Sequence, residues 1–197
     1  LAYIHDFHLG VTGQASGAPL LARAAVIEAA LSQVLDGKAE NDAFNQLITL
    51  AGLEQRAVVW FRAWFRYLRQ TGLSYGIPTV VAALGNHAAM ARAIIALFVT
   101  LHDPAFKGDR AKEAAKRDAE INAGLAKVSA IDEDRILRLF RAVVKASLRT
   151  NAFAPAAKEA LAFKLDSAKV PGLPAPLPWR EIFVYSPRVE GIHLRAG

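Results

Sequence analysis

The sequence predicts a mainly α protein, a multi-helix bundle with short β segments at the N- and C-termini. From residue 19 to residue 152, apolar side chains recur three or four positions apart, as on one face of a helix. Near both ends, apolar and polar residues alternate instead, as they do on a strand. Hydrophobic residues make up 53% of the 197 residues, which indicates a packed chain and argues against disorder.

Turn residues divide the chain into five segments. Residues 1–9 are expected to form a strand, and the glycine-rich residues 10–18 a flexible linker. Residues 19–152 form the predicted helical domain. Residues 153–179 are a proline-rich connector with a possible short strand at "ALAFKLDS". Residues 180–197, "REIFVYSPRVEGIHLRAG", alternate like a pair of strands.

The clearest helix is "EQRAVVWFRAWFRYLRQTG", residues 54–72. At about 100° per residue, its aromatic and aliphatic side chains share one face, and Arg62, Arg66 and Arg69 share the opposite edge. Periodicity and terminal Gly or Pro predict further helices over residues 19–37, 41–52, 79–86, 87–102, 110–128 and 129–151.

Composition indicates the cellular location and the surface character of the protein. The chain has no cysteine, which excludes disulfides and thiolate metal sites and fits a cytoplasmic location. No basic and apolar leader follows Leu1, so we expect no signal peptide. The longest apolar run, residues 87–103, contains Arg92 and falls short of the roughly 20 residues that span a membrane. The net charge of +6 is spread among acids, which indicates a solvated basic surface.

No histidine is predicted to bind a metal. His5 and His8 point to opposite faces if residues 1–9 form a strand, so the two cannot chelate one ion without a bend. His87, His102 and His193 have no matched acid or nucleophile nearby in the sequence.

Two other patterns carry weak functional signals. The glycines of "GVTGQASG" (Gly10, Gly13 and Gly17) lack the G-x-G-x-x-G spacing of a dinucleotide loop, so we predict a linker. The three acids of "IDEDR" are expected to serve the helix dipole, and not general acid–base catalysis. We therefore predict no catalytic, cofactor-binding or metal-binding residue.

Several stretches resemble the large bacterial NAD-specific glutamate dehydrogenases. The most specific is "FKLDSAKVPGLPAPLPWREIFVYSPRVEGIHLR", preceded by "AIDEDRILRLFRAVVKASLRTN". Upstream, "FNQLITLAGL" and "FRAWFRYLRQTG" are similar to a helical motif of that family, and "IHDFHL" is similar to the end of an ACT-like regulatory module. These stretches occur in the order that the family shows.

The resemblance implies an enzyme that uses NAD to deaminate L-glutamate oxidatively to 2-oxoglutarate and ammonia. It implies that this chain is the helical region between the ACT-like modules and the catalytic core, with the first core strands at residues 180–197. The catalytic and NAD-binding motifs would lie beyond Gly197, so the segment alone is expected to be inactive and to bind no cofactor. Its expected partners are the rest of the same polypeptide and, at full length, further copies of it; neither nucleic acid nor membrane is expected.

The residues alone leave two alternatives open. A standalone basic helical module could bind nucleic acid, anionic lipid or a protein partner, since "WFRAWFRYLR" mixes aromatic and arginine side chains. Because these two types separate onto different faces, we favour a core helix. Alternatively, aromatic side chains such as Trp60 and Trp64 could face a second copy of the chain.

Overall fold

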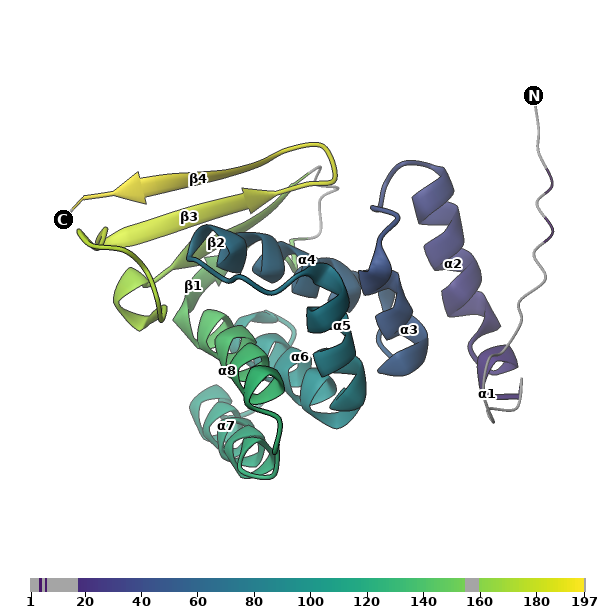
Figure 1. Cartoon of the computed structure of the whole chain (residues 1–197), viewed down its shortest axis with the longest axis horizontal. Coiled ribbons are helices and arrows are strands. Elements are labelled where there is room, and N and C mark those ends of the chain that lie inside the picture. Colours follow the sequence, from purple (N-terminus) through teal and green to yellow (C-terminus); the bar gives the residue numbers. More distant parts are fainter. Residues whose placement is uncertain (1–3, 5, 7–17, 155–159, 197) are drawn as a thin grey trace.

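The computed structural model describes residues 4, 6, 18–154 and 160–196, in which helices come first and an antiparallel sheet follows (Figure 1). The helices are α1 (Ala18–Leu21), α2 (Ala24–Leu35), α3 (Leu47–Leu50), α4 (Gln55–Gln70), α5 (Ile77–Asn86), α6 (Ala88–His102), α7 (Arg110–Leu125) and α8 (Ile131–Ala146), with 3-10 turns η1 (Ala43–Gln46) and η2 (Ser167–Lys169). The strands are β1 (Ser147–Thr150), β2 (Leu161–Leu165), β3 (Arg180–Tyr185) and β4 (Glu190–Arg195).

The mainly α fold class with β segments toward the C-terminus is confirmed. The possible strand in "ALAFKLDS" is β2, and the predicted strand pair in residues 180–197 is β3 and β4. The predicted strand at residues 1–9 and linker at residues 10–18 lie outside the described residues, apart from Ile4, Asp6 and Ala18. The division into five segments stays a prediction.

A glycine with a positive φ follows each of two helical segments of the core. Gly52 follows η1 and α3 with a φ of 67°, and Gly72 follows α4 with a φ of 96°. Only glycine adopts such angles without steric cost, so the chain can leave each helix sharply. The turn at Gly52 brings η1 and α3 back against α4.

The last predicted helix, over residues 129–151, is too long. α8 ends at Ala146, and Ser147–Thr150 form β1 instead. Ser147 Oγ donates to the Val143 carbonyl at 2.9 Å, and the Asp166 amide donates to the Ala146 carbonyl at 2.9 Å. These bonds satisfy helix-end carbonyls, so pairing with β2 replaces a further helical turn.

The predicted helix over residues 19–37 is broken into α1 and α2. Arg23 lies at the break, and its guanidinium donates to the Gly52 carbonyl at 2.7 Å and to the Leu53 carbonyl at 2.9 Å. These bonds tie the first residues of α2 to the turn before α4. The break therefore coincides with a tertiary anchor that helical periodicity does not reveal.

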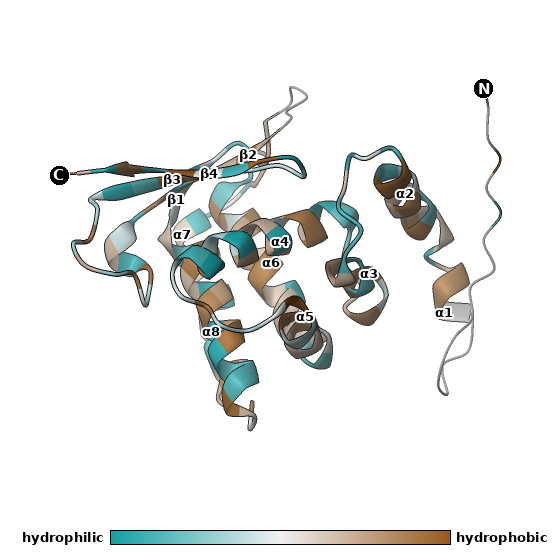
Figure 2. Ribbon diagram, turned by 45° about the horizontal axis from the view of Figure 1, so that its top comes forward, coloured by the Kyte–Doolittle hydropathy of each residue, from teal (hydrophilic) through white to brown (hydrophobic). Residues whose placement is uncertain are grey.

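The sheet has the order β1-β2-β3-β4, with every neighbouring pair antiparallel. Alternate residues of β2 and β3 are buried, and Phe163 lies directly opposite Phe183. The helices lie on one side of the sheet, as Figure 2 shows. Every residue of β4, in contrast, is exposed. The helical layer therefore covers one face of β2 and β3 but not β4.

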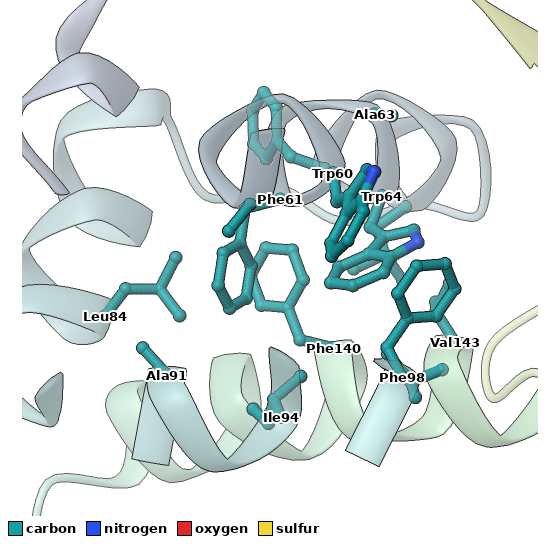
Figure 3. Close-up of a cluster of buried hydrophobic side chains, with 14 of the residues drawn as sticks. Trp60, Phe61, Ala63, Trp64, Leu84, Ala91, Ile94, Phe98, Phe140 and Val143 are labelled. Atoms are coloured by element: carbon teal, nitrogen blue, oxygen red, sulfur yellow. The ribbon is translucent and has the colours of Figure 1, made fainter. Parts of the chain in front are cut away.

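Aromatic rings from α4, α6 and α8 form the centre of the hydrophobic core (Figure 3), and rings of the sheet pack against them. Phe98 of α6 packs edge-on against Trp60 and Trp64 of α4, with ring centroids 4.9 and 5.0 Å apart. It also meets Phe163 of β2 at 6.1 Å. Phe140 of α8 packs against α4 from another side. The aromatic face of α4 is thus a core face, as its periodicity predicts.

Among the described residues, none of the helices by itself combines the length and the apolar character needed to cross a membrane. α5 and α6 meet that test only when taken together, and they are bent by 94° relative to each other.

Replacing Phe98 with Ala is expected to lower the free energy of unfolding by about 3–5 kcal/mol, because the side chain is fully buried among five other rings. Chemical denaturation measures the change. Ile131→Ala is the control: Ile131 is 83% exposed, so its loss should change stability by less than about 0.5 kcal/mol. Equal losses in both variants would contradict this core.

Candidate functional site

The described residues contain a charged junction, at which side chains of α4 and of the segment before it meet the sheet. It comprises Glu40, Asp42, Arg62, Arg66, Tyr67, Glu181, Tyr185 and Glu190. Arg62 stands at its centre and is only 1% exposed. The arginine edge of α4 is therefore not uniformly solvated: Arg62 is buried, Arg66 half-buried and Arg69 exposed.

Arg62 is held by a two-point ion pair. Its Nε and Nη2 atoms each donate to one carboxylate oxygen of Asp42, both at 2.8 Å. Nη2 also donates to Asn45 Oδ1 at 2.9 Å, and Nε lies 3.1 Å from Glu40 Oε2. This fork geometry is specific to arginine, because a lysine ammonium cannot present two parallel donors.

The acids reach Arg62 because the segment before α3 folds over the arginine edge of α4. Asp42 also caps η1, where its Oδ1 accepts from the Phe44 amide at 3.0 Å. One carboxylate therefore fixes both the start of the turn and the guanidinium. The Arg62 guanidinium additionally lies over the Phe44 ring, 5.7 Å from its centroid.

Glu40 extends the junction to the sheet. One of its carboxylate oxygens accepts from Arg66 Nη2 at 3.0 Å, and the other accepts a short hydrogen bond from the Tyr185 hydroxyl of β3. Arg66 also lies 3.8 Å from Glu190 of β4. The segment before α3, helix α4 and strands β3 and β4 are thus joined by one set of polar contacts.

The junction also contains a fully buried contact between α4 and β3. The Tyr67 hydroxyl of α4 donates to Glu181 Oε2 of β3 at 2.6 Å. Tyr67 is 1% exposed and Glu181 is 2% exposed. Packing supports the pair, since the rings of Tyr67 and Phe183 lie 5.6 Å apart.

Burial and neighbouring charges shift the pKa values of this site in consistent directions. Burial raises the pKa of Tyr67, and the Glu181 carboxylate raises it further. Burial likewise raises the pKa of Tyr185, as does its hydrogen bond to Glu40. Burial lowers the pKa of Arg62, but Asp42 and the other neighbours outweigh it, so the net shift is upward. Both phenols therefore remain protonated donors, and the arginine remains charged.

The acids of "IDEDR" lie at the start of α8, as predicted, but they also make tertiary contacts. Asp132 accepts from the Tyr75 hydroxyl at 2.5 Å. Glu133 accepts from Asn86 at 2.8 Å and lies 2.7 Å from His87 Nε2. The hydrogen bonds from Asn86 and His87 lower the pKa of Glu133. His87 thus has an acid partner that is 46 residues away in the sequence.

The other predicted residues do not come together. His102 is half-buried at the end of α6 beside Phe98, and its buried Nε2 has no hydrogen-bond partner among the described residues. His193 is exposed on β4. His5, His8 and the glycines at 10, 13 and 17 lie outside the described residues.

Neither a metal site nor a dinucleotide site can be built from the residues that the structure describes. Within this part of the chain, no three His, Asp or Glu side chains are grouped so as to hold a metal ion. A dinucleotide fold needs parallel strands and a glycine-rich turn into a helix, whereas every strand pair described here is antiparallel. That the segment binds no cofactor stays a prediction.

Sequence reasoning missed the charged junction for a definite reason. The helical period places Arg62 opposite the aromatic face, which is typical of solvent exposure. The sequence feature that could have revealed the junction is the pair of acids in "AENDAF", which lies at the start of the predicted helix of residues 41–52. Only the tertiary fold shows that these acids lie over α4.

Two family models match separate parts of the chain. Residues 39–104 match the model described as glutamate dehydrogenase, helical motif 3. Residues 120–197 match the model described as bacterial NAD-glutamate dehydrogenase, catalytic domain. The first range contains Glu40, Asp42, Arg62, Arg66 and Tyr67, and the second contains the residues of β3 and β4.

Three curated proteins, each called NAD-specific glutamate dehydrogenase, are similar to most of the chain. The Pseudomonas aeruginosa protein is 40% identical over 179 residues, and the Mycobacterium tuberculosis protein is 40% identical over 174 residues. The Halomonas elongata protein is 38% identical over 199 aligned positions. The alignments cover 87%, 85% and 99% of this chain, respectively, but only 11%, 11% and 12% of those proteins.

Replacing Arg62 with Leu is expected to destabilise the chain by about 3–5 kcal/mol, because Asp42 and Glu40 would lose their buried partner. Urea denaturation measures the loss. Arg69→Leu makes the same change on the exposed surface of α4 and should cost less than about 0.5 kcal/mol. A loss for Arg62→Leu no larger than that of the control would show that the ion pair does not stabilise the fold.

His102 should give stability a pH dependence. Burial and the nearby Arg110 charge lower its pKa from 6.5 to about 4. Below about pH 6.5 the unfolded chain therefore binds a proton that the folded chain does not, so stability should fall from about pH 6.5 to about pH 4.

Unfolding free energies measured across this pH range test the point. His102→Gln should flatten this part of the profile, whereas His193→Gln, on the exposed strand β4, should leave it unchanged. Identical slopes in the native chain and in the His102→Gln chain would rule out the buried neutral imidazole as the cause.

Proposed function

Because the chain belongs to the family of bacterial NAD-specific glutamate dehydrogenases, we propose that it is a structural and regulatory connector within such an enzyme. The whole enzyme would convert L-glutamate, NAD and water into 2-oxoglutarate, ammonia and NADH. The segment would contribute no catalytic residue to that reaction.

One observation carries this proposal: the charged junction joins the two ranges that match family models. Glu40, Arg62 and Tyr67 fall within the helical-motif range, and Glu181 and Tyr185 within the catalytic-domain range. The Tyr67–Glu181 contact is buried and the Tyr185–Glu40 contact partly buried, and both pair side chains more than 100 positions apart. A displacement of the helical motif would therefore be transmitted to β3, which is what a connector requires.

The uncovered strand β4 supports a continuation of the structure in the whole enzyme. Leu194 and Ile192 are 56% and 36% exposed at the edge of the sheet, and Val189 in the preceding turn is 65% exposed. An apolar sheet edge with unpaired backbone groups favours further pairing or cover. We propose that the rest of the same polypeptide, with its ACT-like modules and catalytic core, supplies that cover in a cytoplasmic homo-oligomer.

A standalone nucleic-acid module is less compatible with the structure. Base stacking needs exposed aromatic rings beside the arginines. Trp60 and Trp64 are instead 3% and 1% exposed, and Arg62 is committed to Asp42. The same burial leaves neither tryptophan free to meet a second copy of the chain.

The connector role can be tested in a dehydrogenase that carries this segment. Tyr67→Phe removes the hydroxyl that satisfies buried Glu181, at a cost of about 1–3 kcal/mol to the junction. We expect glutamate-dependent NADH formation to fall roughly tenfold, because displacements of about 1 Å far from the chemistry can cost about 100-fold.

Tyr75→Phe is the matched control, since Tyr75 bonds Asp132 away from the junction and should leave turnover unchanged. The chain of 197 residues alone should form no NADH from glutamate. Turnover by that chain, or full turnover by folded Tyr67→Phe enzyme, would contradict the proposal.

A further inference from the structure

A cavity of about 280 Å³ opens beside the charged junction. Its walls come from the end of α2 and the residues after it, from one edge of α4, from Ala152 and the start of β2, and from the β3–β4 turn. The side chains that matter to its chemistry are Gln33, Lys38, Arg56, Trp60 and Arg62. This volume is close to the lower limit of small-molecule sites, about 300 Å³, so the cavity suits a compact ligand.

Every charged side chain that lines the cavity among the described residues is a cation: Lys38, Arg56 and Arg62. The nearby carboxylates do not line it. Asp42 and Glu40 hold the Nε and Nη2 atoms of Arg62, and Asp36 pairs with Lys38 at 2.9 Å on the exposed surface. A ligand in the cavity would therefore meet positive groups first.

Two of these cations can still accept an anionic partner. Arg62 Nη1 is buried and has no hydrogen-bond partner among the described residues, although Nε and Nη2 are fully engaged. A buried donor of a charged group that lacks an acceptor is costly. Arg56 has no carboxylate partner in the described part of the chain, and its guanidinium lies over the Trp60 ring, 5.6 Å from the centroid.

We propose that this cavity binds a small organic carboxylate. One carboxylate group accepts from Arg62 Nη1 and Arg56, Lys38 adds long-range attraction, and Trp60 and Val59 provide an apolar wall for the carbon chain. At Arg62, a carboxylate group with its single negative charge suits the site better than a doubly charged phosphate group, because Glu40 and Asp42 lie directly behind Arg62. The bound anion would bridge α2, α4 and the β3–β4 turn.

Calorimetric titration of the folded chain with succinate, at constant ionic strength set by sodium chloride, tests this proposal. We expect saturable 1:1 binding that raises the unfolding temperature. Arg56→Gln should weaken binding about tenfold, since a hydrogen bond to a charged group is lost. Arg69→Gln makes the same charge change on the exposed surface of the same helix and should leave the affinity unchanged.

A second measurement locates the ligand. The indole N–H resonance of Trp60 should shift on titration, whereas that of Trp179, outside the cavity, should not. Three results would overturn the proposal: no saturable binding of succinate, equal affinities for Arg56→Gln and Arg69→Gln, or binding of inorganic phosphate without binding of succinate. The proposal does not depend on whether the whole protein is a dehydrogenase.

Discussion

The two-point ion pair between Arg62 and Asp42 is the interaction around which the junction is arranged. It places a permanent positive charge inside the protein, 1% exposed, and that charge requires acidic partners. Asp42 meets the requirement while it caps η1, and Glu40 meets it while it accepts from Tyr185. The position of β3 relative to α4 follows from this chain of contacts, as do the burial of Tyr185 and the cationic cavity beside it.

The ion pair and the aromatic core have different roles in the fold. The rings around Phe98 supply apolar burial, which is the larger favourable contribution to folding. Buried ion pairs, in contrast, lose much of their attraction to desolvation and are weak evidence for net stability. Their geometry is nevertheless restrictive, because each buried charge tolerates few arrangements. The core therefore favours a compact state, and the charged junction selects the packing of helix against sheet.

The sequence predicted what depends on local pattern. The core face of α4, the ends at Gly52 and Gly72 and the strands β2, β3 and β4 follow from periodicity and turn residues. What depends on contacts between distant residues was not predictable: Ser147–Thr150 continue a helical pattern, and only pairing with β2 makes them a strand. The site was missed for the same reason, since Arg62 lies on the polar edge of its helix and its acids reach it through tertiary folding. The bond between Tyr67 and Glu181, 114 positions apart, has no local signal at all.

A double-mutant cycle between Glu40 and Tyr185 tests most directly whether the charged junction couples the helical motif to the sheet. Unfolding free energies of Glu40→Gln, Tyr185→Phe and the double variant isolate the energy of this one contact from the other bonds of Glu40. We predict a coupling energy of about 0.5–3 kcal/mol, as expected for two groups in direct contact. A coupling below about 0.3 kcal/mol, within the range of independent sites, would contradict it.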